Sequence, residues 1–219
     1  MNRVSSWFCK LFLKPIVDLC LIKEVKGLRN IPKGNFILVS NHQSHLDWIA
    51  SAYPCVPRRF TYVGQVDRYT GFSGIGRDLL YLIAGVIPVN RKDKYSKNIA
   101  IKKATQALRR GDIVIIYPEG TRSRDGKIHK GKTGAAKLYF KTGIPILPMA
   151  IKGTFELLPP GGRLKVRRIV KINIGKPLCF EEQREKAKSL DCNSEEYKYL
   201  LQEITNKVME EITRLYEKL

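Results

Sequence analysis

The sequence predicts an α/β fold in which a central β-sheet, which could be mixed, is wrapped by helices. Three observations support this prediction. Short apolar runs rich in β-branched residues recur along the chain, and helical patterns separate several of them. The 219 residues are enough to bury one sizeable core. No internal repeat or long low-complexity linker divides the chain, so we expect one domain with helical additions at both ends.

Six apolar runs are the predicted strands. The first follows a Pro-Lys-Gly-Asn turn and contains four consecutive apolar side chains. The fourth reads Asp-Ile-Val-Ile-Ile-Tyr, a β-branched run without helical period that is typical of a buried central strand. Because open α/β sheets bind ligands beyond the carboxyl ends of their strands, the polar segments that follow these runs are the candidate functional residues. The predicted strands cover residues 35–40, 59–63, 84–89, 112–117, 144–151 and 166–174.

The N-terminal 24 residues predict a helix that lies in a membrane interface. Apolar side chains fall on one helical face, and charged residues repeat every four positions on another. Pro15 should kink or divide the helix. The stretch is too short to span a bilayer, and it lacks the small-residue cleavage site of a secretory signal. The alternative is an amphipathic helix that packs on the core. The apolar face consists of Trp7, Phe8, Leu11, Phe12, Ile16 and Leu19.

Two further helical patterns complete the predicted architecture. Residues 69–83 carry apolar side chains that could dip into lipid near the functional site. Residues 197–216 form a long amphipathic pattern, which we expect to pack on the body without a catalytic role. The predicted organisation is an N-terminal membrane-interface helix at residues 1–24, a core at residues 25–180 and a C-terminal helical extension at residues 181–219.

The charge is unevenly distributed and favours an anionic partner. Residues 1–180 hold 33 basic and 10 acidic side chains, a balance of +23, whereas residues 181–219 hold 7 and 10, a balance of −3. A nucleic-acid-binding protein would be expected to carry a known recognition motif, or aromatic residues interleaved with its basic residues for base stacking. The basic runs of this sequence contain few aromatic residues. Apolar anchors do lie nearby. We therefore expect anionic membrane lipids as partners and no nucleic acid.

The five cysteines do not suggest a metal site. They form no C-x-x-C pair and their number is odd, so neither a structural zinc site nor a disulfide framework is expected. A reducing compartment fits this usage. We expect no metal and no cofactor.

Residues 41–47, Asn-His-Gln-Ser-His-Leu-Asp, offer a base and a carboxylate directly after the first predicted strand. The five-residue offset between His42 and Asp47 would separate them by about 140° on an unbroken helix. They can therefore meet only if His42 lies in the loop and Asp47 in the first helical turn. A neutral histidine can accept a proton near pH 7, and a carboxylate on its other ring nitrogen would fix the tautomer. The alternative is that Asp47 only caps the helix, together with Ser44.

Residues 117–123, Tyr-Pro-Glu-Gly-Thr-Arg-Ser, end the fourth predicted strand and could hold a phosphate. Gly120 permits a turn that other residues resist, and Arg122 can bind a phosphate through two parallel hydrogen bonds. Lys132 opens the next helical pattern, and a helix N-terminus with a lysine is suited to anions. Arg91 ends the third predicted strand, and between the other segments it becomes a second phosphate ligand. The alternative for residues 117–123 is an ordinary polar turn.

The order of these segments resembles the 1-acylglycerol-3-phosphate acyltransferase family of glycerolipid acyltransferases over roughly residues 25–180. The resemblance implies a glycerol-3-phosphate acyltransferase-like fold, with the histidine of the His-x4-Asp motif as general base. It also implies that an acyl thioester, of coenzyme A or an acyl carrier protein, acylates lysophosphatidic acid to phosphatidic acid. We expect a monotopic membrane enzyme with its active site on the cytoplasmic side. The implied catalytic residues are His42 and Asp47, and the implied substrate-binding residues are Arg91, Glu119, Gly120, Thr121, Arg122 and Lys132.

Departures from the family pattern leave other functions open. Pro88, Asn90 and Gly131 stand where the family often has an aromatic residue, an acid and an aromatic residue, respectively. The acceptor could therefore be glycerol 3-phosphate or another lysophospholipid. A serine hydrolase that uses Ser44 or Ser123 is disfavoured because no G-x-S-x-G elbow occurs. A non-enzymatic basic protein that binds anionic lipid or nucleic acid is the alternative from a different class.

Overall fold

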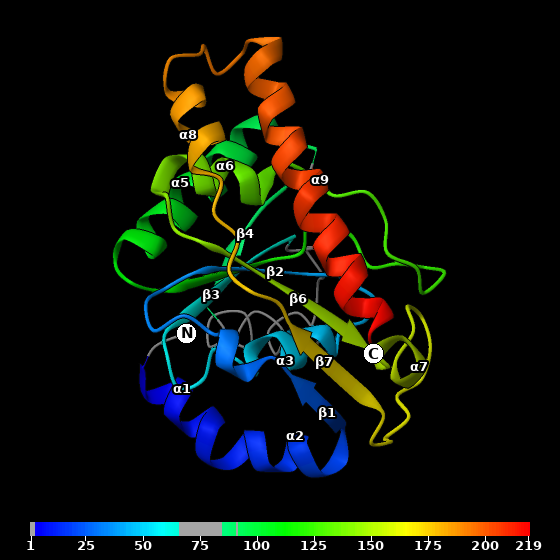
Figure 1. Cartoon of the computed structure of the whole chain (residues 1–219). Helices are drawn as coiled ribbons and strands as arrows, with labels where there is room; N and C mark the ends of the chain where they lie inside the picture. The colour runs from blue at the N-terminus through cyan, green and yellow to red at the C-terminus, as the bar shows by residue number, and fades with distance from the viewer. Residues whose placement is uncertain (1–2, 66–84, 91) are drawn as a thin grey trace.

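The computed structural model describes residues 3–65, 85–90 and 92–219 and confirms the α/β fold (Figure 1). Its strands are β1 Ile22–Lys26, β2 Ile37–Ser40, β3 Phe60–Gly64, β4 Val86–Pro88, β5 Ile113–Ile116, β6 Ile146–Lys152 and β7 Val170–Ile174. They form one sheet in the order β1-β7-β6-β2-β5-β3-β4. Neighbouring strands run parallel except β6 and β7, which are antiparallel, so the sheet is mixed.

All six predicted strands occur, and β1 is a seventh that the sequence does not reveal. Its residues, Ile-Lys-Glu-Val-Lys, mix charged and apolar side chains, and only Ile22 is buried. The strand lies at the edge of the sheet and pairs only with β7, so it needs no continuous apolar run. It also crosses the predicted boundary between residues 24 and 25 and joins its first residues to the sheet of the core.

The central strands are buried on both faces, which explains their uninterrupted apolar sequences. In β2, Ile37 and Val39 pack against the helices on one face of the sheet. Phe36, which precedes β2, and Leu38 belong to the apolar cluster on the other face. This alternation follows from the two-residue period of a strand. The two clusters fix the sheet between helical layers, so the loops at its carboxyl edge start from rigid positions.

Four helices lie on one side of the sheet: α5 Lys94–Arg109, α6 Gly134–Thr142, α8 Glu181–Lys188 and α9 Glu195–Glu217 (Figure 1). The side chain of Asp93 caps α5 by accepting the N–H groups of Tyr95 and Ser96 at 2.9 and 3.1 Å. The apolar face of α9 is buried against the body, as predicted. The residues that α9 buries in this way include Leu200, Leu201, Ile204, Val208, Ile212 and Leu215.

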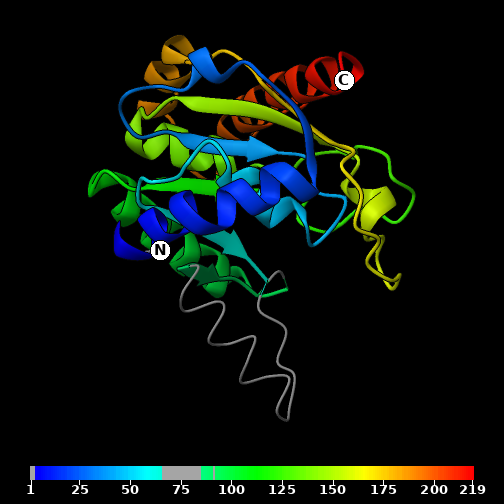
Figure 2. The same ribbon diagram turned by 90° about the horizontal axis from the view of Figure 1, so that it is seen from below.

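The other helical segments of the described residues lie on the other side of the sheet (Figures 1 and 2). They are α1 Arg3–Phe8, the π-helical turn η1 Cys9–Leu13, α2 Lys14–Cys20, α3 Asp47–Ala52 and α7 Thr154–Leu157, and a 3-10 turn, η2, covers Leu28–Asn30. The predicted kink at Pro15 takes the form of the wide turn η1, because a proline at the start of α2 has no N–H to donate to the preceding turn.

The N-terminal helices turn their apolar face outward. Its six residues, Trp7, Phe8, Leu11, Phe12, Ile16 and Leu19, are between 44 % and 74 % exposed. Polar side chains hold the segment to the body instead: Ser6 Oγ donates to the Arg58 carbonyl and Lys14 Nζ donates to Tyr53 Oη, both at 2.7 Å. Val17 and Leu21 pack against the core. This arrangement contradicts the alternative in which the apolar face packs on the core.

No helix in the described residues has the length and apolar character needed to cross a membrane. The predicted lipid-contacting helix at residues 69–83 lies outside the described part of the chain, as does Arg91.

Candidate active site

Two loops meet where the parallel strands β2 and β5 end. The strands are neighbours, with Val39 opposite Ile116, so the chain leaves both at the same edge of the sheet. Two hydrogen bonds of 2.8 Å then join the loops. The His42 N–H donates to Glu119 Oε1, and the Ser123 N–H donates to the His42 carbonyl. The two motifs, 76 residues apart in sequence, therefore form one structural unit.

Asn41 fixes the first loop to a third strand, β6. Its Nδ2 donates to the Ile151 carbonyl and its Oδ1 accepts the Ile151 N–H, both at 2.8 Å. The side chain is fully buried. It continues the pairing of β2 with β6 for one more residue after the backbone has turned away. The chain therefore reaches His42 in a fixed direction.

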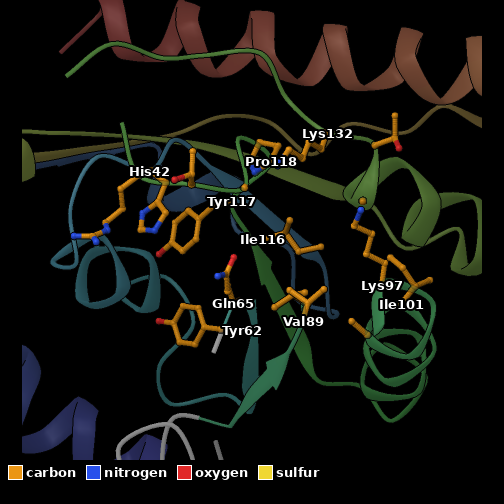
Figure 3. Close-up of a pocket in the computed structure, with 18 of the residues that line it drawn as sticks. His42, Tyr62, Gln65, Val89, Lys97, Ile101, Ile116, Tyr117, Pro118 and Lys132 are labelled. Carbon is orange, nitrogen blue, oxygen red and sulfur yellow. The ribbon is translucent and has the colours of Figure 1, made fainter. Parts of the chain in front are cut away.

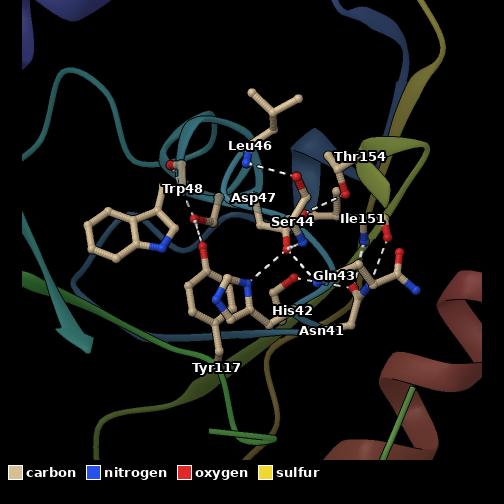
Figure 4. Close-up of polar contacts among 12 residues, drawn as sticks. Asn41, His42, Gln43, Ser44, Leu46, Asp47, Trp48, Tyr117, Ile151 and Thr154 are labelled. Atoms are coloured by element: carbon tan, nitrogen blue, oxygen red, sulfur yellow. Dashed lines mark hydrogen bonds and ion pairs between the residues drawn. The ribbon is translucent and has the colours of Figure 1, made fainter. Parts of the chain in front are cut away.

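The carboxylate of Asp47 is fully buried and accepts four hydrogen bonds (Figure 4). Oδ2 lies 2.9 Å from His42 Nδ1 and accepts the N–H groups of Gln43 and Ser44 at 2.6 and 2.7 Å. Oδ1 accepts the hydroxyl of Thr154 at 2.6 Å. Because every backbone and hydroxyl partner is a donor, the ionised carboxylate fits this site. The carboxylate then selects the histidine tautomer with a proton on Nδ1 and a free lone pair on Nε2.

Asp47 is the first residue of α3 but does not cap it, because the cap residue Leu46 makes no side-chain cap hydrogen bond. Its carboxylate instead accepts the Ser44 N–H in the turn before the helix, where Ser44 Oγ accepts the Leu46 N–H at 3.2 Å. These bonds shape residues 42–47 into a tight turn. That turn overcomes the 140° separation that an unbroken helix would impose, and it brings the carboxylate to the imidazole.

The ring of His42 is held on its face as well as at its edge. It stacks on Tyr117 with ring centroids 4.1 Å apart and an angle of 12° between the planes. The hydroxyl of Tyr117 is hydrogen-bonded to Ser51 Oγ at 2.7 Å, and burial keeps its pKa well above the usual value. Among the described residues, Nε2 of His42 has no hydrogen-bond partner, and His42 lines the adjoining cavity. The free nitrogen is thus available to a substrate.

Glu119 faces the protein interior and does not line the cavity. Its side chain is 4 % exposed, and besides the His42 N–H it accepts the His129 N–H at 3.2 Å. Burial raises its pKa to about 7, although the two N–H donors and the charge of His129 lower it. The sequence analysis places Glu119 among the substrate-binding residues. In the structure its carboxylate instead lies between the two loops and links them by hydrogen bonds.

The other described residues of the predicted binding set do line the cavity, which has a volume of about 520 Å³. Gly120, Thr121, Arg122 and Lys132 all contribute to its wall. Gly120 has φ +72°, and a Cβ there would come within 2.8 Å of Lys132 Nζ. The left-handed backbone of the turn is what favours glycine here, and the flexible lysine side chain passes close to it.

Three further basic residues line the same cavity and were not predicted. They are His45, Lys97 on α5 and Lys137 on α6, and no described acidic residue contributes to the wall. In Figure 3, His42 and Lys97 stand on opposite sides of the cavity. Burial, with the charges of Arg122 and His42, lowers the pKa of His45. The cavity also has apolar walls, formed by Trp48, Val63, Val89, Ile101 and Ile116 among others.

The two serines considered as nucleophiles are committed to other contacts. Ser44 Oγ donates to the Leu158 carbonyl at 2.7 Å, and Ser123 Oγ donates to Asp125 Oδ1 at 2.8 Å. Both residues are buried, and neither lines the cavity. This placement contradicts a serine-hydrolase mechanism that uses either of them with His42.

Comparison with known proteins also relates this chain to acyltransferases. A family model described as Acyltransferase matches residues 23–152, which is more than half of the chain. The 1-acyl-sn-glycerol-3-phosphate acyltransferase BAT2 of Brassica napus is 30 % identical over 185 residues, covering 77 % of this chain and 51 % of that protein. The 1-acyl-sn-glycerol-3-phosphate acyltransferase of Borreliella burgdorferi is 34 % identical over 131 residues, covering 59 % and 51 %. This chain thus spans about half the length of these relatives.

A solved structure extends the similarity to nearly the whole chain. The crystal structure of the 1-acyl-sn-glycerophosphate (LPA) acyltransferase PlsC from Thermotoga maritima superposes with a TM-score of 0.66 and 26 % sequence identity. The match covers 99 % of this chain and 78 % of that one. The fold, the joined His-x4-Asp and Glu-Gly-Thr-Arg loops and the family match agree, and the chain belongs to the acyltransferase family.

Proposed function

We propose that this chain transfers a fatty acyl group from an acyl thioester to the free hydroxyl of 1-acylglycerol 3-phosphate, giving phosphatidic acid. The observation that carries the proposal is the His42–Asp47 pair at a cavity with a basic and partly apolar wall. The printed names of the relatives support this substrate, because each of those described above is a 1-acyl-glycerol-phosphate acyltransferase.

His42 acts as the general base. Its Nδ1 proton is held by Asp47, so the Nε2 lone pair accepts the proton of the acceptor hydroxyl. The hydroxyl oxygen attacks the thioester carbonyl carbon, and a tetrahedral intermediate forms. When this intermediate collapses, the C–S bond breaks, and the imidazolium returns its proton to the departing thiolate. The buried carboxylate of Asp47 stabilises the transient imidazolium, as it does in a catalytic triad.

The basic wall orients the acceptor. Arg122 and Lys132 bind its phosphate, and Arg91 joins them by the family resemblance. A phosphate held in this way places the free hydroxyl at His42, and such orientation can lower a barrier by several kcal/mol, up to roughly 7–11 in the best intramolecular models. The apolar side chains of the cavity favour a lysolipid over glycerol 3-phosphate, because a lysolipid brings an acyl chain to bury.

The donor is an acyl thioester of coenzyme A or of an acyl carrier protein. Direct transfer between thioester and hydroxyl requires no redox step and no bound cofactor. We propose that the enzyme works at the cytoplasmic face of a membrane, because its proposed acceptor is a lipid and the exposed N-terminal face offers a monotopic anchor.

Replacing the base tests the proposal directly. We expect His42→Ala to lower kcat/KM for acyl transfer by about 10²–10⁴, because the general base that Asp47 positions is removed. His129→Ala is the matched control, since this histidine is exposed and lies outside the cavity lining. Turnover is measured by mass spectrometry of phosphatidic acid formed from lysophosphatidic acid and an acyl thioester. A folded His42→Ala protein with near-normal turnover would refute the mechanism.

Arg122→Ala should raise KM for the acceptor more than KM for the thioester, because the guanidinium binds a phosphate that does not react. Arg122→Lys should restore only part of the loss, since lysine keeps the charge without the two-pronged geometry. Arg124→Ala, two residues further along and outside the cavity lining, is the control. If Arg122→Ala impairs a neutral acceptor with the same glycerol core as strongly as the charged acceptor, the phosphate assignment is wrong.

Glu119 should make stability depend on pH. Its pKa is about 7 in the folded protein, against an ordinary value of 4.5 for a glutamate. Between these values the unfolded chain is ionised while the folded chain still holds the proton, so stability falls as pH rises. Glu119→Gln should remove this contribution to the pH dependence. The contribution is a fall in the free energy of unfolding on the order of 2–3 kcal/mol between pH 4.5 and 7. Urea unfolding of wild type, Glu119→Gln and the exposed-site control Glu156→Gln measures it, and equal slopes in all three would contradict the assignment.

The N-terminal face should bind membranes through apolar contact. The double variant Leu11→Ser/Phe12→Ser removes two exposed apolar side chains and should weaken vesicle binding at least about tenfold. In high salt the loss should be larger, because screening removes the contribution of the basic body and leaves only the apolar contact. Vesicle co-sedimentation at low and high salt is the measurement, with Tyr95→Ser on α5 as the exposed control. Unchanged binding of the double variant in high salt would exclude this face as the anchor.

A further inference from the structure

A second surface combines exposed apolar and basic side chains. It lies in the loop between α7 and β7, where residues 163–168 read Arg-Leu-Lys-Val-Arg-Arg. We name these six residues the basic–apolar loop. All six are exposed; Leu164 is 54 % and Val166 is 64 % exposed, and neither belongs to an apolar core cluster. Two aliphatic side chains among four cations, all facing solvent, are unusual for a connection with a purely structural role.

The loop is held in place at both ends. The Lys165 N–H donates to the Leu157 carbonyl at the end of α7, at 2.8 Å. Arg168 Nε donates to the carbonyl of Ile22, the first residue of β1, also at 2.8 Å. Apart from this bond of Arg168, the basic side chains form no hydrogen bond or ion pair with the described part of the chain. Their charges are therefore available to a partner.

The position of the loop relates it to the N-terminal helices. Ile22 follows the end of α2 by two residues, and the exposed side chains of Ile16 and Leu19 lie on that helix. Figure 2 shows the loop projecting from the end of the molecule at which α2 terminates. The apolar residues of α2 and those of the loop thus lie on the same side of the sheet and near the same edge strand, β1.

We infer that the basic–apolar loop is a second membrane contact, in which its cations bind anionic lipid headgroups while Leu164 and Val166 enter the interface between them. The inference rests on the proposed membrane location of the enzyme, but on residues outside both the N-terminal helices and the cavity. Charge complementarity and continuity with the exposed face of α2 favour a bilayer over an acidic protein as the occupant. Two weak signals together give stable attachment where one alone is reversible.

The segment that precedes the basic–apolar loop contacts the His-x4-Asp loop. That segment begins with Thr154, whose hydroxyl binds Asp47, and Leu158, whose carbonyl binds Ser44. The loop at residues 163–168 is therefore continuous in sequence with the segment that holds the His-x4-Asp loop.

Two variants of the full chain separate the charge and apolar parts of the inference. Arg163→Gln/Lys165→Gln/Arg167→Gln removes three charges and spares Arg168, which has a structural bond. The vesicles contain phosphatidylcholine with about 30 mol% phosphatidylglycerol. We expect the affinity of the variant for them to fall about fivefold per charge removed, which is on the order of a hundredfold for all three. Leu164→Ser/Val166→Ser should weaken it about tenfold and should do so in high salt as well.

Matched controls lie on the opposite side of the sheet. Lys102→Gln/Lys103→Gln/Arg109→Gln on α5 makes the same change in net charge at exposed positions, and Tyr199→Ser on α9 removes an exposed aromatic side chain. We expect these variants to retain most of the vesicle binding. All variants should retain turnover with a short-chain acceptor dissolved below its aggregation limit, which shows that the site is intact.

The outcomes decide the inference. Selective loss of vesicle binding in the loop variants supports it. Equal losses in the loop and control triple variants would show that only overall charge matters and would overturn it. Unchanged vesicle binding, with turnover lowered only when the donor is an acyl carrier protein thioester, would overturn it in favour of a protein-docking surface. Absence of acyl transfer by the wild type would refute the proposed function instead, since vesicle binding is measured without substrate.

Discussion

The site depends on one buried carboxylate. Asp47 has no exposed surface, and burial of an ionised group costs several kcal/mol unless donors surround it. Its four hydrogen bonds come from His42, from two backbone N–H groups of the same loop and from Thr154 on α7. The same bonds that make the charge tolerable shape the loop that leads into α3 and connect α7 to the site. The geometry of the base therefore follows from the requirement to satisfy one charge.

The proposed general base and the cations proposed to bind the substrate differ in rigidity. His42 is held by Asp47 at one edge and by Tyr117 on its face, and it is 8 % exposed. Arg122 is partly exposed and Lys132 exposed, and both lie on long side chains. A general base gains from a fixed position, because proton transfer requires hydrogen-bond geometry in the transition state. Flexible cations can instead follow a phosphate as the acceptor enters, at the cost of side-chain entropy when it binds.

The sequence predicts the sheet and the His42–Asp47 pair better than it predicts which residues line the cavity. Continuous apolar runs mark strands buried on both faces, whereas the edge strand β1 mixes charges with apolar residues and gives no such signal. The His42–Asp47 contact is predictable because only one loop geometry allows it. For Glu119 the orientation was not predictable: Gly120 and Arg122 of the same loop line the cavity, while the glutamate turns inward to two backbone N–H groups. The sequence contains forty lysine and arginine residues and does not show that Lys97 and Lys137 line the cavity. Their position there results from the packing of α5 and α6.

Gly131, which stands where the family often has an aromatic residue, shows how the C-terminal helix α9 affects the site. A Cβ on Gly131 would lie 2.8 Å from Met209 Cγ and 3.0 Å from Thr205 Cγ2, so α9 occupies the space that a larger side chain would need. The next residue, Lys132, donates its N–H to the Pro118 carbonyl at 2.8 Å, and its side chain crosses Gly120. Close packing transmits such a constraint because a core leaves no room to relax. No described residue of α9 lines the cavity, yet the helix sets the path of the chain that brings Lys132, the proposed phosphate ligand, to the cavity.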